Sequence, residues 1–291
     1  MNDEKIYDIA FSFDESITPI EKKFLIEKYG SSKEVLKLSK GLLKNILGRK
    51  WTGNRYNPEN FIEQSKKMAD FMDKASIKTV RFNEDDYPDL LKEIPDLPFL
   101  LYYRGNIQYD YNRSIAIVGT RQPNFEGVER VNHFTETLIN NGFTIVSGLA
   151  LGIDAESHKK TLQNKGKTIA VLGCGIDRIY PVENREIGRA ILEHDGALIS
   201  EYPPGVEPKK WYFPKRNRII VGLSKSVLIV QSPERSGSLI SAFLSADYNR
   251  NLYVCSANPN CSTDEGNRIL IRTGASEVHT PDDILTDMMA G

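Results

Sequence analysis

The sequence predicts an α/β protein, with an extended, Rossmann-like, doubly wound and mainly parallel sheet behind a small all-helical N-terminal domain. Short, nearly continuous apolar runs recur after residue 114, which is typical of strands buried on both faces of a parallel sheet. Helix-length amphipathic segments separate several of these runs, as doubly wound folds require. The first 75 residues instead contain short amphipathic stretches at helical spacing.

Composition describes an ordinary globular protein. The 291 residues are 40% hydrophobic and 26% charged, and this length is usual for about two domains. The net charge is −1, so any nucleic-acid site must be a local patch. Three cysteines without a CxxC pattern argue against a disulfide framework or zinc ribbon. No apolar run approaches a membrane span of ~20 residues. We therefore expect a cytoplasmic protein without a membrane span.

The N-terminal third is predicted to consist of short helices. Pro19 can occupy the first turn of a helix that Gly30 ends, Ser32 can cap a second, and Gly48 ends a third. A longer helix begins at Asn57-Pro58, and we expect it to bury Phe61, Ile62, Met68, Phe71 and Met72. No helix here is rich in Arg, Asn or Gln, so this region indicates no DNA-reading helix.

The domain boundary is expected between residues 78 and 105. Prolines at positions 88, 95 and 98 exclude a long helix there, and residues 99–105 are predicted to form a strand. We assign residues 1–77 to the helical domain and 78–291 to the Rossmann-like domain. Further strands are expected at 114–119, 143–148, 167–173, 197–200, 226–230 and 251–256, and helices at 126–141, 184–194 and 238–249.

Glycine-rich turns follow several predicted strands. They lie at 119–123, 147–154, 173–177 and 234–239. Ligands of such sheets bind at the carboxyl ends of the strands, where glycines let backbone N–H groups approach an anion. Any one of these turns could be an ordinary tight strand–helix connection. The four together, with Arg121 and Arg235, predict a phosphate-binding rim on one sheet edge.

The most unusual composition lies in residues 207–226, EPKKWYFPKRNRIIVGLSKS. Five cations fall within ten residues of this stretch, and three aromatics sit among them: Lys209, Lys210, Trp211, Tyr212, Phe213, Lys215, Arg216 and Arg218. Cations pair with phosphates and flat rings stack on unpaired bases, so the stretch suits a single-stranded nucleic acid. The alternative is a solvated basic loop that its aromatics dock onto a core.

No catalytic set is apparent. GxGxxG, GxxxxGK[ST], GxSxG and HExxH are all absent, so no nucleotide cofactor and no metal are expected. Asp154 and Asp177 could be acids, but we prefer them as helix caps. Ser236 and Ser238 suit caps or phosphate donors, because no base accompanies them. Glu201 is predicted to be an exposed carboxylate, but no partner carboxylate is evident for a catalytic pair.

Six motifs, taken in their order and spacing along the chain, resemble those of the DNA-processing protein A (DprA/Smf) family. The resemblance rests on IVGTRQP, VSGLALGIDAESH, TIAVLGCGIDRIYPVEN, LISEYPPG, FPKRNRIIVGLS and ERSGSLISA, and extends from Tyr87 to about Leu285. It implies an extended Rossmann domain behind a helical, SAM-like domain, and no enzymatic activity. It also implies a cytosolic bacterial protein that binds single-stranded DNA in natural transformation, protects incoming DNA, helps load the RecA recombinase, and forms a homodimer through the Rossmann-like domain.

The resemblance also assigns DNA contacts. By motif, the DNA-contacting side chains are Arg121, Lys215, Arg216, Asn217 and Arg218, with Arg235 on the same rim. Close backbone or hydroxyl contacts fall to Gly119, Thr120, Gly148, Gly237 and Ser238, and Phe213 packs near a base or shapes the pocket. Lys209, Lys210 and Trp211 remain a solvated or packed flank. The family's common serine after IVG is Thr120 here, which keeps the hydroxyl, and the winged-helix domain that many relatives carry is not expected in this chain.

Two other functions remain open. A nucleotide-cleaving phosphoribohydrolase shares the architecture, but its PGGxGTxxE signature is replaced here by SPERSGSLIS. A nucleotide-sensing module could use the same rim for a small signalling nucleotide, although the basic strip favours a longer polyanion.

Overall fold

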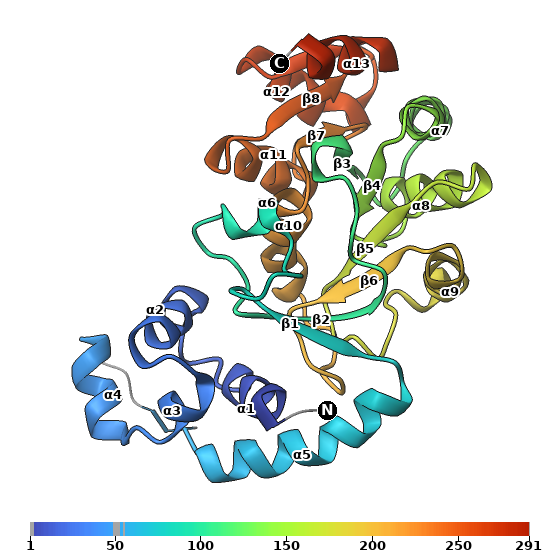
Figure 1. The fold of residues 1–291 in the computed structure, drawn as a ribbon. Coiled ribbons are helices and arrows are strands. Elements are labelled where there is room, and N and C mark those ends of the chain that lie inside the picture. The colour runs from blue at the N-terminus through green and yellow to red at the C-terminus, as the bar shows by residue number, and fades with distance from the viewer. Residues whose placement is uncertain (1–2, 49–52, 55, 291) are drawn as a thin grey trace.

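The computed structural model describes residues 3–48, 53–54 and 56–290. An N-terminal helical region lies beside one end of a nine-stranded sheet that is covered by helices on both faces (Figure 1). The predicted fold class is confirmed. The division at residue 77 and the SAM-like character of the first part stay predictions.

The N-terminal helical region is built from α1 (Asp3–Ser12), α2 (Pro19–Tyr29), α3 (Ser32–Leu36), α4 (Lys40–Leu47) and α5 (Pro58–Lys74). Thr18 and Glu21 form a capping box at the start of α2, and Gly48 ends α4 in a left-handed conformation. The sequence analysis placed its first helix at Pro19 and did not predict α1. Phe71, expected to be buried, is 48% exposed on the outer side of α5, whereas Phe61 and Met72 are buried as expected.

The sheet contains β1 (Lys78–Arg81), β2 (Leu100–Gly105), β3 (Ser114–Val118), β4 (Thr144–Ser147), β5 (Thr168–Leu172), β6 (Ala197–Ser200), β7 (Ser226–Ile229), β8 (Asn251–Cys255) and β9 (Ser276–Val278). Their order is β1-β2-β6-β5-β4-β3-β7-β8-β9, with β1 and β2 antiparallel at one edge and the rest parallel. The short helix α6 (Asp89–Lys92) lies between β1 and β2 in sequence, which agrees with prolines that exclude a long one.

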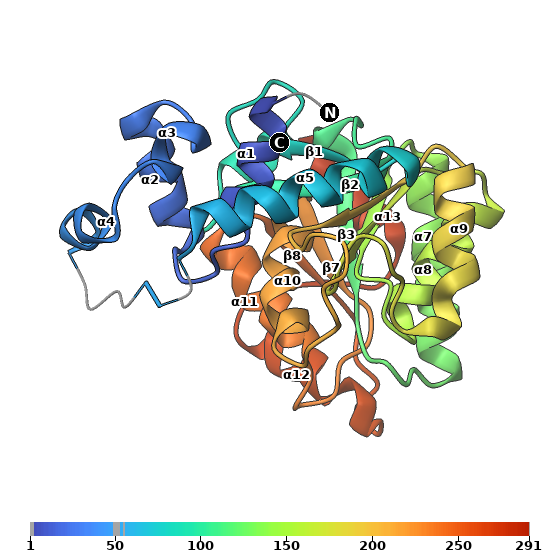
Figure 2. The same cartoon turned by 90° about the horizontal axis from the view of Figure 1, so that it is seen from below.

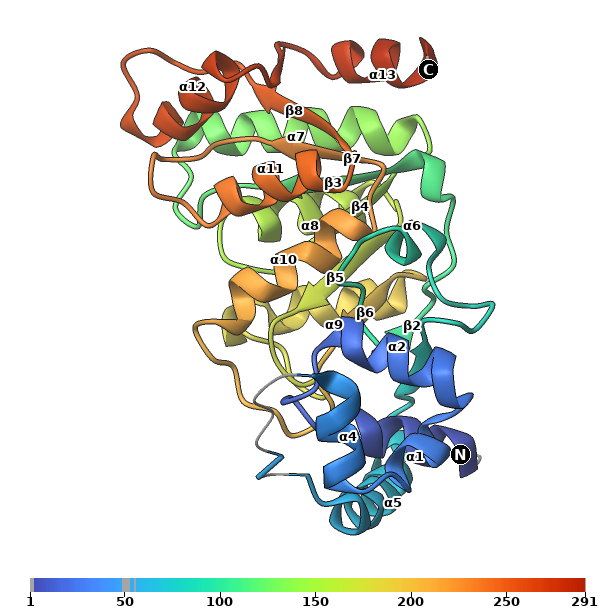
Figure 3. The same cartoon turned by 90° about the vertical axis from the view of Figure 1, so that its left-hand side faces the viewer.

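Helices cover both faces of the sheet. One face carries α7 (Phe125–Asn140), α8 (Ile153–Gln163), α9 (Arg185–Glu193) and α13 (Pro281–Ala290); the other carries α10 (Tyr212–Gly222), α11 (Ser238–Asp247) and α12 (Glu265–Arg272) (Figure 2). Figure 3 shows α10 and α11 side by side on the second face. Within the described residues, no helix is long and apolar enough to cross a membrane.

The apolar core continues from the sheet into the helical region. Buried side chains of α1 and α2, such as Phe11 and Leu25, belong to the same cluster as Leu101 of β2 and Ile199 of β6. A second cluster fills the opposite face, where Ile117 and Ile145 pack against Phe134 of α7. The helical region is thus packed against the β2–β6 part of the sheet.

The chain reverses its direction across the sheet between β3 and β7. From β3 it proceeds through β4 and β5 to β6 on one side, and β7 then returns to pair with the other side of β3. A switch point of this kind opens a crevice at the carboxyl ends of the two central strands, where doubly wound proteins bind ligands. The glycine turns at 119–123 and 234–239 both lie here.

Candidate nucleic-acid interface

The basic stretch at 207–226 contains a helix rather than an extended strip. In α10, Phe213, Arg216, Asn217 and Ile220 are spaced at helical intervals and face the crevice between β3 and β7. Pro214 is tolerated because it lies within the first turn, where backbone N–H groups have no helical partner. The remaining cations of the stretch therefore do not all reach the same surface.

The crevice holds a pocket of about 390 Å³, which we call the rim pocket. It is built from the ends of β3 and β4, the start of α11 and one side of α10. Its lining includes Gly119, Thr120, Arg121, Asp154, Lys210, Phe213, Arg216, Asn217, Arg235, Ser236, Gly237 and Ser238. The expectation that Arg121 and Arg235 share one sheet edge is confirmed by this lining.

The turn after β3 is fixed by close backbone packing. The Thr120 amide donates to the carbonyl of Gln231 after β7 (2.7 Å), and the Ile153 amide donates to the Thr120 carbonyl (3.1 Å). Gly152 has φ +78°, and a Cβ there would lie 2.4 Å from the Thr120 oxygen, so a side chain is excluded. The backbone that carries Arg121 is thus held between two neighbouring turns.

The turn before α11 supplies hydroxyls. Ser236 and Ser238 are hydrogen-bonded through their Oγ atoms (2.7 Å), and Ser238 Oγ donates to Ser232 Oγ (2.9 Å). The Ser238 amide donates to Ser236 Oγ (3.3 Å), which is a local serine turn. Neither serine is the N-cap of α11, because that position is Gly237 and no side chain caps the helix. Asn217 Nδ2 donates to the Gly237 carbonyl (3.3 Å), which ties α10 to this turn. The pocket therefore places hydroxyls and the α11 N-terminus beside its cations.

Arg216 forms the floor of the pocket and is 4% exposed. Its Nη1 donates to the carbonyl oxygens of Gly148 (2.7 Å) and Val171. A Cβ on Gly148 would lie 2.6 Å from Arg216 Nη2 and 2.7 Å from Asp154 Oδ2, so this glycine makes room for the buried charges. Burial raises the pKa of Asp154 and lowers that of Arg216, while their mutual attraction opposes both shifts.

Phe213 stands at the mouth of the pocket. Its ring packs on Gly173, where a Cβ would lie 2.8 Å from Phe213 Cδ1, and its centroid lies 5.6 Å from that of Tyr180. The Arg121 guanidinium carbon is 5.7 Å from the Phe213 ring centroid, which is within cation–π range. An aromatic ring and an exposed guanidinium thus share one rim, as a stacked base and its phosphate require.

Two of the predicted DNA-contacting cations lie elsewhere. Arg218 is 4% exposed on the other side of α10, where Nη2 donates to Glu201 Oε1 (2.5 Å) and Nε lies 3.5 Å from Asp96 Oδ2. Lys215 Nζ lies 3.4 Å from Glu201 Oε2. Neither lines the rim pocket, because helical geometry turns both away from Phe213 and Asn217. The interpretation of Glu201 as an exposed carboxylate was wrong, because its side chain is 13% exposed and neutralises these cations.

Sequence reasoning also missed residues that matter here. Lys210, assigned to the flank, lines the rim pocket. Asp154 does not cap α8: its Oδ2 accepts from the Ala150 amide (3.4 Å) and faces Arg216. Asp177 Oδ1 accepts from the Gly205 amide (2.9 Å) and fixes a loop instead of a helix. No local sequence signal distinguishes these roles, because each depends on a partner distant in the chain.

The charge balance of the rim pocket is positive. Arg121, Lys210 and Arg235 are exposed, and none of them makes a salt bridge with a residue in the described part of the chain. Asp154 is the acidic side chain among the described lining residues, and Arg216 offsets it. Cations without a salt-bridge partner around a concave, partly aromatic pocket attract a polyanion, and each of the three can pair with a phosphate.

The chain is similar in sequence to known proteins. Residues 78–289 match the family model of DNA recombination-mediator protein A. Protein Smf of Synechocystis is 34% identical over 99% of this chain and 74% of its own length, and DNA processing protein DprA of Bacillus subtilis is 39% identical over 73% and 71%.

Solved structures give the same result. The X-ray structure of DNA processing protein A from Streptococcus pneumoniae aligns with a TM-score of 0.78 and 32% identity over 98% of both chains. DNA processing protein A of Helicobacter pylori, in a structure described for its single-stranded DNA binding mode, aligns with a TM-score of 0.66 and 30% identity over 74% of this chain and 96% of that one. The chain therefore belongs to the DNA recombination-mediator protein A family, the DprA/Smf proteins.

Proposed function

We propose that this protein binds single-stranded DNA in the rim pocket. The observation that carries the proposal is the set of unpaired cations Arg121, Lys210 and Arg235 around Phe213 at the switch point of the sheet. Phosphates pair with such cations, and an unpaired base stacks on an aromatic ring at the same rim. Family membership and the single-strand binding described for the Helicobacter pylori relative support the same assignment.

The pocket is better suited to binding than to cleavage. A glycosidic or phosphodiester hydrolase needs a carboxylate or another base that is free to move a proton. The acidic side chain that lines the described pocket, Asp154, is buried behind Arg216 and engaged by the backbone. This supports a non-enzymatic protein rather than a nucleotide-cleaving phosphoribohydrolase.

The wider role follows from the family resemblance. We infer a cytoplasmic protein that protects incoming DNA during natural transformation and helps load RecA, and that acts as a homodimer through its Rossmann-like part. Sedimentation of the purified chain tests the dimer. RecA filament formation on DNA coated by a competing single-strand binder, with and without this protein, tests the loading role.

Charge reversal at Arg121 tests the DNA site. Arg121→Glu should weaken binding of a labelled single-stranded oligonucleotide by about tenfold or more, whatever its sequence, in fluorescence anisotropy at low salt. Arg113→Glu is the matched control, because Arg113 precedes β3 and therefore lies at the opposite end of the same strand. If Arg121→Glu bound the oligonucleotide as tightly as the wild type, the proposed DNA site would be refuted.

A further inference from the structure

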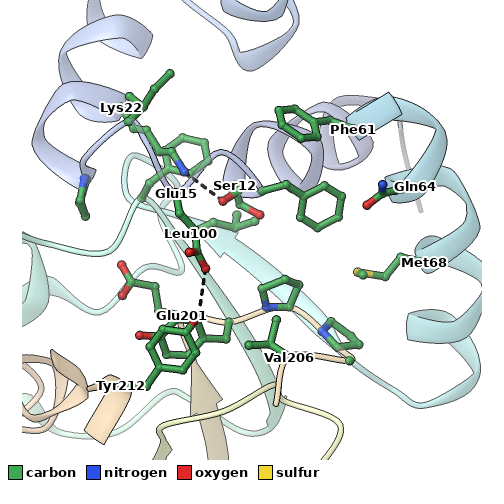
Figure 4. Close-up of a pocket in the computed structure, with 18 of the residues that line it drawn as sticks. Ser12, Glu15, Lys22, Phe61, Gln64, Met68, Leu100, Glu201, Val206 and Tyr212 are labelled. Carbon is green, nitrogen blue, oxygen red and sulfur yellow. Dashed lines mark hydrogen bonds between the residues drawn. The ribbon is translucent and has the colours of Figure 1, made fainter. Parts of the chain in front are cut away.

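A second pocket lies where the N-terminal helical region meets the sheet. It measures about 570 Å³, within the usual range of ligand sites, and we call it the junction pocket. Figure 4 shows Phe61, Gln64 and Met68 of α5 on one wall and Tyr212 and Val206 on the other. The DNA site described above does not use it.

The two pockets share the first turn of α10. Lys210, Phe213 and Pro214 line the rim pocket, whereas Trp211, Tyr212 and Lys215 line the junction pocket. An α-helix with its side chains is about 10–12 Å across, so the two pockets are separated by about one helix diameter on opposite sides of α10. A longer strand bound in the rim pocket can therefore extend to the junction pocket.

Its entrance combines one exposed ring with two buried rings and two lysines. Trp211 is 65% exposed, and Lys209 Nζ lies 5.6 Å from the Trp211 ring centroid and 5.1 Å from that of Tyr212. The Tyr212 and Tyr202 rings are inclined at 30° with centroids 4.0 Å apart, and Lys215 Nζ lies 5.7 Å from the Tyr202 centroid. This is a stacking platform with positive charge at its edge, the combination that holds single strands.

The interior is polar in a way that suits a base and not a phosphate. Tyr202 is 5% exposed, and its hydroxyl is buried without a hydrogen-bond partner among the described residues. Buried polar atoms of this kind are costly unless a partner meets them. Glu15 also lines the pocket, where it accepts from the Tyr212 hydroxyl (3.1 Å). Carboxylates repel a phosphate but accept from an exocyclic amino group such as that of cytosine.

We propose that the junction pocket is a second nucleotide subsite, which receives an unpaired base of the same strand that occupies the rim pocket. The proposal rests on the proposed function. The base stacks on the exposed ring of Trp211 and points its amino edge inward, while the flanking phosphates remain outside, near Lys209. The N-terminal helical region, through α5, thereby forms one wall of the DNA path.

Oligonucleotide length separates the two subsites. We would measure Kd for deoxycytidine oligomers of about 4 and about 16 nucleotides, the two ends of common single-strand site sizes. Trp211→Ala should raise Kd for the long oligomer about tenfold or more, because stacking of one base is worth that much. Gln64→Glu, which adds a carboxylate to an exposed position on the α5 wall, should raise the same Kd severalfold. Neither change should alter Kd for the short oligomer by more than about twofold.

Two controls complete the test. Asn60→Glu places the same charge one helical turn away, on an exposed position of α5 outside the pocket lining, and should raise Kd for the long oligomer less than Gln64→Glu does. In a Trp51→Phe background Trp211 is the remaining tryptophan of the sequence, and its fluorescence should be quenched by the long oligomer alone.

Three outcomes would overturn the subsite alone: equal effects of Trp211→Ala on both lengths, no effect on either, or an Asn60→Glu effect as large as that of Gln64→Glu. Failure of the wild type to bind either oligomer would instead remove the proposed function, and the subsite with it.

Discussion

The two sides of α10 place positive charge in different ways. On the rim side, Arg121 and Arg235 are exposed and make no salt bridge with a described residue. On the junction side, Lys215 and Arg218 both approach Glu201, and Arg218 is almost fully buried. The cations on the two sides of α10 thus divide into one set open to phosphates and one set that Glu201 already neutralises. The number of basic residues in a stretch is therefore a poor measure of its charge toward DNA.

Arg216 lies beneath the rim, and its loss should have the largest effect on stability. Arg216→Met leaves Asp154 buried without its cation and the Gly148 and Val171 carbonyls without their donor. We expect the free energy of unfolding to fall by about 3–5 kcal/mol in urea titrations. Arg189→Met is the matched control, because it breaks only an exposed ion pair with Glu186 and should cost less than about 1 kcal/mol. Equal losses would show that Arg216 is not a buried structural charge.

Lys22, which lines the junction pocket, tests whether a buried charge on that side changes the pH dependence of stability. Burial lowers the pKa of Lys22 to about 8, against the attraction of Asp14 and Glu201. Between about pH 8 and pH 10.5 the unfolded chain binds a proton that the folded chain lacks, so stability rises with pH in that window. Relative to Lys22→Met, the wild type should gain up to about 3 kcal/mol there. Lys23→Met, at a more exposed position of the same helix, should follow the wild type. Parallel pH curves for the wild type and Lys22→Met would contradict the burial of this charge.

Neighbouring lysines give the smallest and sharpest contrast. Lys210 lines the rim pocket, whereas Lys209 lies over Trp211 and Tyr212 on the junction side. With an oligonucleotide of about 4 nucleotides, Lys210→Ala should reduce the slope of log affinity against log salt by about 0.7. Lys209→Ala should leave that slope unchanged. A slope that is reduced by Lys209→Ala and not by Lys210→Ala would place the short strand on the junction side of α10 and contradict the assignment.

Much of the fold was accessible from sequence because buried parallel strands are encoded locally. The apolar runs at 114–119, 143–148 and 226–230 agree with β3, β4 and β7 to within one residue at each end. The glycine turns then identified the switch-point crevice, since ligands of doubly wound sheets bind at strand ends. Arg121 and Arg235 could be placed together on this basis.

The failures concern side-chain direction. The 207–226 stretch was interpreted as a continuous basic strip, but helical periodicity sends Asn217 to the rim pocket and Arg218 to Glu201. Phe71 was expected on the buried face of its helix and is 48% exposed. Glu201 and Asp154 acquire their roles from Arg218 and Arg216, which lie on a different element of the fold. Pairings of this kind depend on tertiary structure, so residue spacing alone does not reveal them.

The central claim is that the rim pocket binds single strands through phosphates and an unpaired base. Binding of single- and double-stranded oligonucleotides of equal length, measured across salt, tests it most directly. We predict tighter binding of the single strand at every salt concentration, with log affinity falling against log salt by about 0.7 for each phosphate contacted. Equal or tighter binding of the duplex, or affinity that does not change with salt, would contradict the account.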